Sequence, residues 1–156
     1  MAYQKLQAGR AWAVNKSDNT DIPNIGIAGP TGTTTTGSTT QLIDAAATFL
    51  TSGVKLNMIV VNTTDSTQAV VIGIEDDNTL TVSANIFAAS GKSYAIYGGD
   101  QEGAVLYIGT AGNLKVTTVA GDEVTFQGVN TGAFFPVNVT KVFATGTSAD
   151  NIIALW

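Results

Sequence analysis

The chain has 156 residues, of which 44% are hydrophobic and only 12% are charged, and its formal net charge is −5. It contains no cysteine and no histidine, which excludes disulfides, thiolate metal sites and cysteine nucleophiles and removes the commonest general base. The seven basic residues are dispersed rather than clustered, which argues against nucleic-acid binding. We therefore expect one or two small domains without an enzyme site, a metal or a cofactor.

The location of the protein is constrained by the same composition. No run of about 18 apolar residues is present, so we predict no membrane span. The first five residues are not followed by the apolar core of a signal peptide. Thr, Asn, Ser and Gly replace the missing charges, which favours a β protein packed beside other copies over a free cytosolic enzyme.

The first 40 residues contain one strand signal. Residues 1–10 are polar and form an arm, for which disorder and ordering on a neighbouring molecule both stay open. Residues 11–14 predict a strand in which Trp12 belongs to the core, and Pro23 ends regular pairing. Residues 28–40 are dominated by Thr and Gly and predict a linker, placed at residues 31–40, or an extended edge, because a phosphate-binding loop would need a lysine.

Residues 41–98 predict a second β unit. Residues 42–49 are rich in alanine and could form a short helix. The strands that follow are separated by turns of Asp, Asn, Ser and Gly, which is typical of a compact barrel or a small open sheet. The predicted strands are residues 56–62, 68–74, 79–83 and 93–97.

Residues 104–156 predict an antiparallel sandwich or barrel. Short runs rich in β-branched and aromatic residues end in glycine turns about 8–12 residues apart. Within the runs, Leu114 and Val116 alternate with polar neighbours, as do Val124 and Phe126, which indicates strands with one buried face. The runs are residues 104–109, 113–119, 123–129, 134–144 and 151–156.

Apolar residues give the strongest indication of a protein–protein interface in this region. Phe134 and Phe135 are adjacent and would face opposite sides of a strand, and Pro136 suggests an edge or a bend. An outward aromatic beside an unpaired edge is what a neighbouring subunit covers, although burial of both rings between two sheets stays open. Trp156 ends an apolar run and is expected to be paired in a sheet. The candidate interface residues are Trp12, Phe134, Phe135, Pro136 and Trp156.

Three polar motifs are candidates for binding sites. Residues 91–93 are Gly-Lys-Ser, but Ile86 stands where a phosphate-binding loop requires glycine, so we expect a turn. Residues 75–78 and 18–21 are acidic without the spacing of a calcium loop, and Asp and Asn are common in turns. No pair of acids is marked out for glycoside hydrolysis. The acids considered are Asp44, Asp100, Glu102 and Asp122.

Several segments carry a family resemblance. They are Leu-Tyr-Ile-Gly-Thr-Ala-Gly-Asn-Leu-Lys-Val from residue 106, Asp-Glu-Val-Thr-Phe-Gln-Gly-Val from residue 122, Gly-Ala-Phe-Phe-Pro-Val from residue 132, and residues 144–156, with Ala-Val-Asn-Lys-Ser-Asp-Asn-Thr-Asp-Ile-Pro upstream. They resemble the head-spike base proteins of tailed bacteriophages and gene transfer agents. Residues 41–98 resemble another module of phage virion proteins through Leu-Ile-Asp at 42, Val-Val-Asn-Thr-Thr at 60 and Tyr-Ala-Ile-Tyr at 94. Asn57-Met58 departs from the Gly-Asp of that module.

The resemblance implies a domain organisation. Residues 1–30 and 103–156 would form an all-β host domain, a sandwich or barrel of jelly-roll type, interrupted by a linker at 31–40 and an inserted small β-barrel module at 41–98. Such insertions are tolerated at loop tips. Two sequential domains behind a long N-terminal arm are the alternative.

The resemblance also implies a function. The chain would be a non-enzymatic virion protein, made in the host cytoplasm, that decorates the capsid exterior as a head-spike base or vertex protein. Its partners would be copies of itself in a ring-like trimer or pentamer, the major capsid protein, and a fibre or spike. Alternatives are a tail, neck or fibre-adaptor component, and a carbohydrate-binding module that uses Trp12, Tyr94 and Tyr97.

Overall fold

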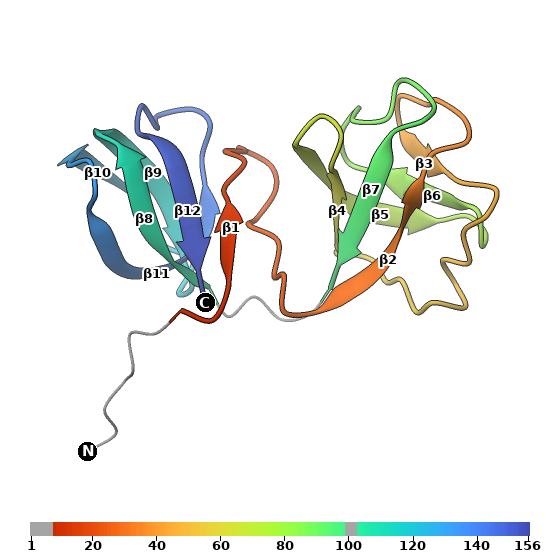
Figure 1. Ribbon diagram of the computed structural model, residues 1–156, viewed down its shortest axis with the longest axis horizontal. Helices are drawn as coiled ribbons and strands as arrows, with labels where there is room; N and C mark the ends of the chain where they lie inside the picture. Colours follow the sequence, from red (N-terminus) through yellow and green to blue (C-terminus); the bar gives the residue numbers. More distant parts are fainter. Residues whose placement is uncertain (1–7, 99–102) are drawn as a thin grey trace, which may run out of the picture. The chain divides into compact units, whose positions relative to one another are not determined.

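The chain consists of two compact units (Figure 1). The computed structural model describes residues 8–98 and 103–156. The first unit comprises Met1–Asp18 and Gln101–Trp156, and the second unit, Asn19–Asp100, interrupts it in the sequence. The first boundary thus falls at Asp18 rather than at the predicted residue 30. Residues after Asp18 pack within the second unit, where Gln68 Nε2 donates to Asp21 O at 2.9 Å.

All regular elements of the described residues are strands, and every pairing between them is antiparallel. The all-β prediction is therefore confirmed. The first unit is one six-stranded sheet in the order β1-β12-β8-β11-β9-β10. Its strands are β1 (Ala11–Ala13), β8 (Ala104–Thr110), β9 (Gly112–Thr118), β10 (Glu123–Val129), β11 (Phe134–Val142) and β12 (Asp150–Leu155).

Alternation along these strands gives the first unit its core. Leu106 and Ile108 on β8 and Leu114 and Val116 on β9 are fully buried. Each such side chain contributes about 1.5–3 kcal/mol by leaving water. No helix or second sheet among the described residues of this unit covers that face, so the sheet must curve to bury it. Figure 1 shows this twist, with β9 and β10 behind β8 and β12.

The second unit is a six-stranded sheet in the order β2-β7-β4-β5-β6-β3. Its core includes Phe49, Phe87 and Ile96. One isolated bridge, between Thr36 and Ile43, links the segment after β2 to β3 without a continuous ladder. The inserted barrel therefore remains a prediction. The strands are β2 (Ala28–Thr33), β3 (Gln41–Ile43), β4 (Ile59–Asn62), β5 (Thr67–Ile74), β6 (Thr79–Val82) and β7 (Ser93–Tyr97).

The short helix expected at residues 42–49 is wrong. Asp44 Oδ1 accepts the Ala46 N–H at 3.0 Å. The Asn78 side-chain amide donates to the carbonyls of Asp44, Ala45 and Ala47 at 3.3, 3.2 and 2.9 Å. Asp44 and Asn78 thus take the backbone groups that a helix would have used, and the segment forms turns.

In place of the linker expected at residues 31–40, the segment begins with the extended edge that was the alternative, since β2 is an edge strand of the second unit's sheet. Its first residues belong to β2 and pair with β7, with Thr33 opposite Ser93. Thr34 is buried, and its hydroxyl accepts the Lys92 N–H at 3.0 Å. Ser38 forms a bridge with Phe87. Threonine hydroxyls and cross-strand pairing satisfy this backbone, so a segment of linker-like composition is part of the second unit.

The first seven residues of the predicted arm lie outside the described residues, as do residues 99–102, which fall between the predicted module and the resumed host domain. So do the two acids Asp100 and Glu102. The described end of the arm is bonded, because Gly9 N donates to Trp156 O at 2.6 Å. Among the described residues, no helix is long and apolar enough to cross a membrane.

Candidate interaction surface

The two adjacent phenylalanines lie on opposite sides of β11. Phe134 is 65% exposed, whereas Phe135 is 8% exposed and its ring packs against Phe126 at 4.5 Å between centroids. Strand alternation and the register of β11 with β8 decide this, because Phe135 is opposite fully buried Leu106. Of the two alternatives left open by the sequence, the structure therefore has one ring inside and one outside.

Pro136 does not lie at a sheet edge. It lies in β11, between β8 and β9 in the strand order. The register of β11 against β8 shifts between Phe135 and Val139, so the proline falls in an irregular stretch where a missing N–H is tolerated. Of the edge or bend that the sequence suggested, the edge is excluded, and the proline lies in the register irregularity of β11.

The two tryptophans are both half-buried. Trp12 lies in β1 opposite Ala154, a buried residue of β12. Trp156 follows β12, and its backbone exchanges two hydrogen bonds with Arg10, at 3.1 and 3.2 Å. The chain end is therefore paired through its backbone, as expected.

The outward side of the first unit's sheet is apolar across four strands. Register places Ala13 opposite Ile153, Ile153 opposite Tyr107, and Tyr107 opposite Phe134. A second row, two residues along, joins Ala11, Leu155 and Val105. We call this set the outer apolar face, and it consists of Ala11, Ala13, Val105, Tyr107, Phe134, Ile153 and Leu155.

Six of the seven members of the outer apolar face were missed by the sequence interpretation, which named only Phe134. Val105, Tyr107, Ile153 and Leu155 lie in the runs of β8 and β12, whose buried residues are apolar as well. Strands that are apolar on both sides are typical of strands covered on both faces. That signal was present in the runs starting at Ala104 and Ile152 and could have identified this surface.

The outer apolar face contains an aromatic pair, in which Phe134 is exposed and Tyr107 is half-buried. The rings of Tyr107 and Phe134 are 5.4 Å apart between centroids at an interplanar angle of 61°. This edge-to-face contact fixes the Phe134 ring at the surface. Two rings at that angle do not form the flat platform on which a sugar stacks, whereas a protruding aromatic suits a protein pocket.

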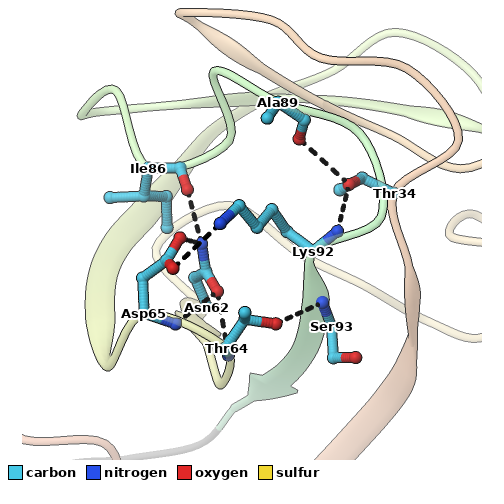
Figure 2. Close-up of polar contacts among 8 residues, drawn as sticks. All are labelled: Thr34, Asn62, Thr64, Asp65, Ile86, Ala89, Lys92 and Ser93. Atoms are coloured by element: carbon cyan, nitrogen blue, oxygen red, sulfur yellow. Dashed lines mark hydrogen bonds and ion pairs between the residues drawn. The ribbon is translucent and has the colours of Figure 1, made fainter.

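The Gly-Lys-Ser segment is occupied by contacts within the second unit (Figure 2). The backbone N–H groups of Gly91 and Lys92 donate to Thr34 at 2.7 and 3.0 Å, and that of Ser93 donates to Thr64 Oγ1 at 2.9 Å. A phosphate would need such amides free. The segment is therefore a turn, as predicted.

The Lys92 ammonium is also engaged (Figure 2). It forms an ion pair with Asp65 at 2.9 Å, and the hydrogen bond from Lys92 lowers the pKa of the Asp65 carboxyl. Fully buried Asn62 donates to Asp65 Oδ2 and to Ile86 O at 2.8 and 2.6 Å. It accepts the Thr64 and Asp65 N–H groups at 3.0 and 3.1 Å. The network closes the β4–β5 turn and has a structural function.

The acidic motifs are turns as well. Asp76 Oδ1 accepts the Asn78 N–H at 2.8 Å, and Asp77 Oδ1 accepts the Thr51 N–H at 3.1 Å. Both Asp18 carboxylate oxygens accept from Thr145, at 2.9 and 2.7 Å, and these bonds lower the Asp18 pKa. Among the described residues, no three acidic side chains gather where they could hold a metal.

The aromatic residues proposed for sugar binding do not form one platform. Tyr94 is buried, and its hydroxyl donates to Asp44 Oδ2 at 2.8 Å. Tyr97 is three residues along the same strand and therefore points to the other side. Trp12 belongs to the first unit. Comparison of the chain with protein-family models, curated proteins and solved structures finds no match.

Proposed function

We propose that this chain is a non-enzymatic structural protein of a tailed-bacteriophage particle that decorates the capsid exterior as a head-spike base or vertex protein. In this proposal, copies assemble into a ring-like trimer or pentamer that docks on the major capsid protein. The outer apolar face of the first unit is the docking surface, with Phe134 as its anchor.

The observation that carries this proposal is the outer apolar face itself. A neutral, apolar sheet face with one row across four strands and a second row across three is a surface that water solvates poorly. The exposed Phe134 ring has the properties of an interface anchor, since binding energy is concentrated in a few aromatic residues. The assignment to a phage particle rests on the resemblance to head-spike base proteins.

The polar groups of the chain support a structural rather than a catalytic function. The buried Asp44 carboxylate and the Lys92–Asp65 ion pair are bonded to neighbours within the second unit. A general base or nucleophile would have to face a substrate. A carbohydrate-binding module has less support, because the three aromatic residues proposed for it do not share one surface.

The proposal is tested by a localised reconstruction of the particle from which the chain comes. We expect density for the chain in a closed ring on the head surface. Density in the tail or neck would reassign the protein to the tail, neck or fibre-adaptor class. An intact particle with no density for the chain would overturn the virion proposal.

A matched pair of variants tests the docking surface. Phe134→Ser removes the anchor, and Leu50→Ser removes a residue of the second unit that is 56% exposed. We expect Phe134→Ser to weaken attachment by about 2 kcal/mol or more, which would lower its incorporation into particles, and Leu50→Ser to incorporate normally. Equal incorporation of both variants would contradict docking through the outer apolar face.

A further inference from the structure

The first unit's sheet ends in an open edge at β10. Among the residues that the structure describes, this strand pairs with β9 alone. Thr118 N donates to Asp122 O at 2.9 Å, so the alternation of an antiparallel ladder directs the backbone groups of Val124 toward β9. By the same alternation, the N–H and C=O groups of Glu123 and Thr125 point away from β9, toward the open edge.

This edge lacks most of the features that protect sheet edges. The opposite edge, β1, has only three residues, whereas β10 has seven. Short strands, charges and prolines normally block pairing with another chain. In β10 the single charged residue is Glu123, which is paired with Lys115 at 3.5 Å, and there is no proline. A bulge near Gly128, whose φ is 61°, interrupts only the end of the strand.

The apolar inner face of the first unit's sheet extends onto β10, where its side chains are incompletely covered. Val124 is opposite buried Val116, and Phe126 is opposite buried Leu114, so both β10 side chains point to the inner face. Val124 is nevertheless 38% exposed, and Phe126 is half-buried. A further strand beside β10 would cover this row.

The sequence of β10 is complementary to itself in the antiparallel direction. A register centred on Thr125 places it opposite Thr125 of a second copy. Val124 then faces Phe126, which is a favourable cross-strand pair, and Glu123 faces Gln127, so no like charges meet. Because the outward backbone groups of Thr125 lie at the centre, the two strands can exchange hydrogen bonds in this register. A second copy of the chain therefore fits this edge.

We propose that β10 pairs antiparallel with β10 of a second copy about a two-fold axis at Thr125, joining two first-unit sheets into one. This inference goes beyond the proposed function, because it concerns the free protein. A two-fold pair is a closed dimer, unlike the trimer or pentamer expected on the particle. It uses an edge and leaves the outer apolar face free.

The test uses single cysteines in the full chain, which has none of its own. Hydrogen-bonded antiparallel partners have Cα atoms about 5.5 Å apart, within the range of a disulfide. We expect oxidised Thr125→Cys to form covalent dimers with a yield about tenfold above that of Thr63→Cys, because pairing raises the effective thiol concentration. Thr63 is an exposed threonine of the second unit. Phe134→Cys, on the outer apolar face, serves as a second control.

The possible outcomes distinguish self-association through the β10 edge from self-association through other surfaces. A dimer by light scattering with selective cross-linking at Thr125→Cys supports the inference. Cross-linking at Phe134→Cys instead, or a trimer or pentamer without cross-linking at Thr125→Cys, overturns it while leaving the ring and the proposed function in place. A monomer at all concentrations also overturns it.

A second variant blocks the edge without disturbing the β9 ladder. Thr125→Pro removes an N–H that points away from β9, and proline is tolerated at such positions. We expect a folded monomer by circular dichroism and light scattering. A Thr125→Pro protein that is still dimeric would contradict the inference. If this variant fails to fold, the cysteine result decides.

Discussion

The two units contain the same kind of sheet but differ in which side chains they bury and which they expose. Each is a six-stranded antiparallel sheet. The second unit buries polar side chains, among them Asp44, Asn62 and Gln68, and most of them bond to its own turns. The first unit buries a single polar residue among its described residues, Thr147, and carries an apolar row on its outward side.

The difference lies in how each unit satisfies its groups. Buried polar groups that are satisfied by local turns hold the loops of the second unit in one conformation. The outer apolar face and the open β10 edge of the first unit instead leave favourable burial unrealised, and they are the surfaces proposed above to bind partners.

The largest stability effect is expected from Asn62→Ala in the second unit. Loss of the side-chain amide leaves Ile86 O and the Thr64 and Asp65 N–H groups without the partner they have now. We expect a loss of about 3–4 kcal/mol in the free energy of unfolding. The matched control is Asn138→Ala at an exposed asparagine, which should change this free energy by less than about 0.5 kcal/mol.

The measurement can assign this effect to one unit. Both tryptophans, Trp12 and Trp156, belong to the first unit. Tryptophan fluorescence therefore follows unfolding of the first unit, and far-UV circular dichroism follows both units. In Asn62→Ala the circular dichroism transition should move while the fluorescence transition stays. If both transitions move together, the units do not unfold independently and the comparison fails.

Tyr94→Phe should have the next largest effect. It removes the hydroxyl that donates to buried Asp44 Oδ2. A hydrogen bond to a charged group contributes about 1.5–3 kcal/mol, so we expect a loss of that size in urea unfolding of the second unit. Tyr107→Phe, which keeps the ring that contacts Phe134, is the control in the first unit. Equal effects of the two variants would contradict the assignment.

The raised pKa of Tyr94 predicts that the stability of the second unit depends on pH in the alkaline range. Burial, followed by the hydrogen bond to Asp44, raises the pKa of Tyr94 above 10.0. The folded chain therefore holds this proton more tightly than the unfolded chain. The protonated Tyr94 hydroxyl contributes fully to the free energy of unfolding below pH 10.0. This contribution is lost as the pH rises toward the pKa of Tyr94 in the folded chain. Thermal unfolding should show this loss in the wild type and a shallower loss in Tyr94→Phe.

A smaller effect is expected on the acid side. The Lys92 hydrogen bond lowers the Asp65 pKa below 3.8. The ionised Asp65 carboxylate therefore contributes fully to the free energy of unfolding above pH 3.8, and this contribution is lost as the pH falls through the Asp65 pKa of the folded chain. Asp65→Asn should flatten the acid dependence of the circular dichroism transition. It should leave the fluorescence transition unchanged, because Asp18 and Asp150 of the first unit keep their own lowered pKa values. An acid dependence identical to that of the wild type would contradict this assignment.

The smallest stability effect is expected from Phe134→Ser. The side chain is 65% exposed, and the one aromatic ring that it contacts among the described residues is that of Tyr107. The fluorescence transition should shift by less than about 0.5 kcal/mol, although attachment to a partner should fall. A loss of several kcal/mol would mean that Phe134 belongs to the core and that the outer apolar face is a folding surface.

Strand positions could be predicted wherever the side chains alternate. Val124 and Phe126 share a face, as their period of two predicts, and the strands over residues 68–74 and 93–97 agree with β5 and β7 within one residue. The helix at residues 42–49 and the linker at residues 31–40 were wrong for one physical reason. The side chains of Asn78 and Thr34 bond backbone groups far along the chain, and such contacts do not enter a local propensity.

The sequence by itself determined that this is an antiparallel β protein and that one of two adjacent phenylalanines could face outward. Only the tertiary structure decided which one does, because Phe135 had to meet Leu106 across the β11–β8 ladder. Register also gathered Tyr107 and Ile153 beside Phe134 from strands far apart in the chain. Composition records how many apolar residues a chain has, whereas the hydrogen-bonded register determines which of them share a surface.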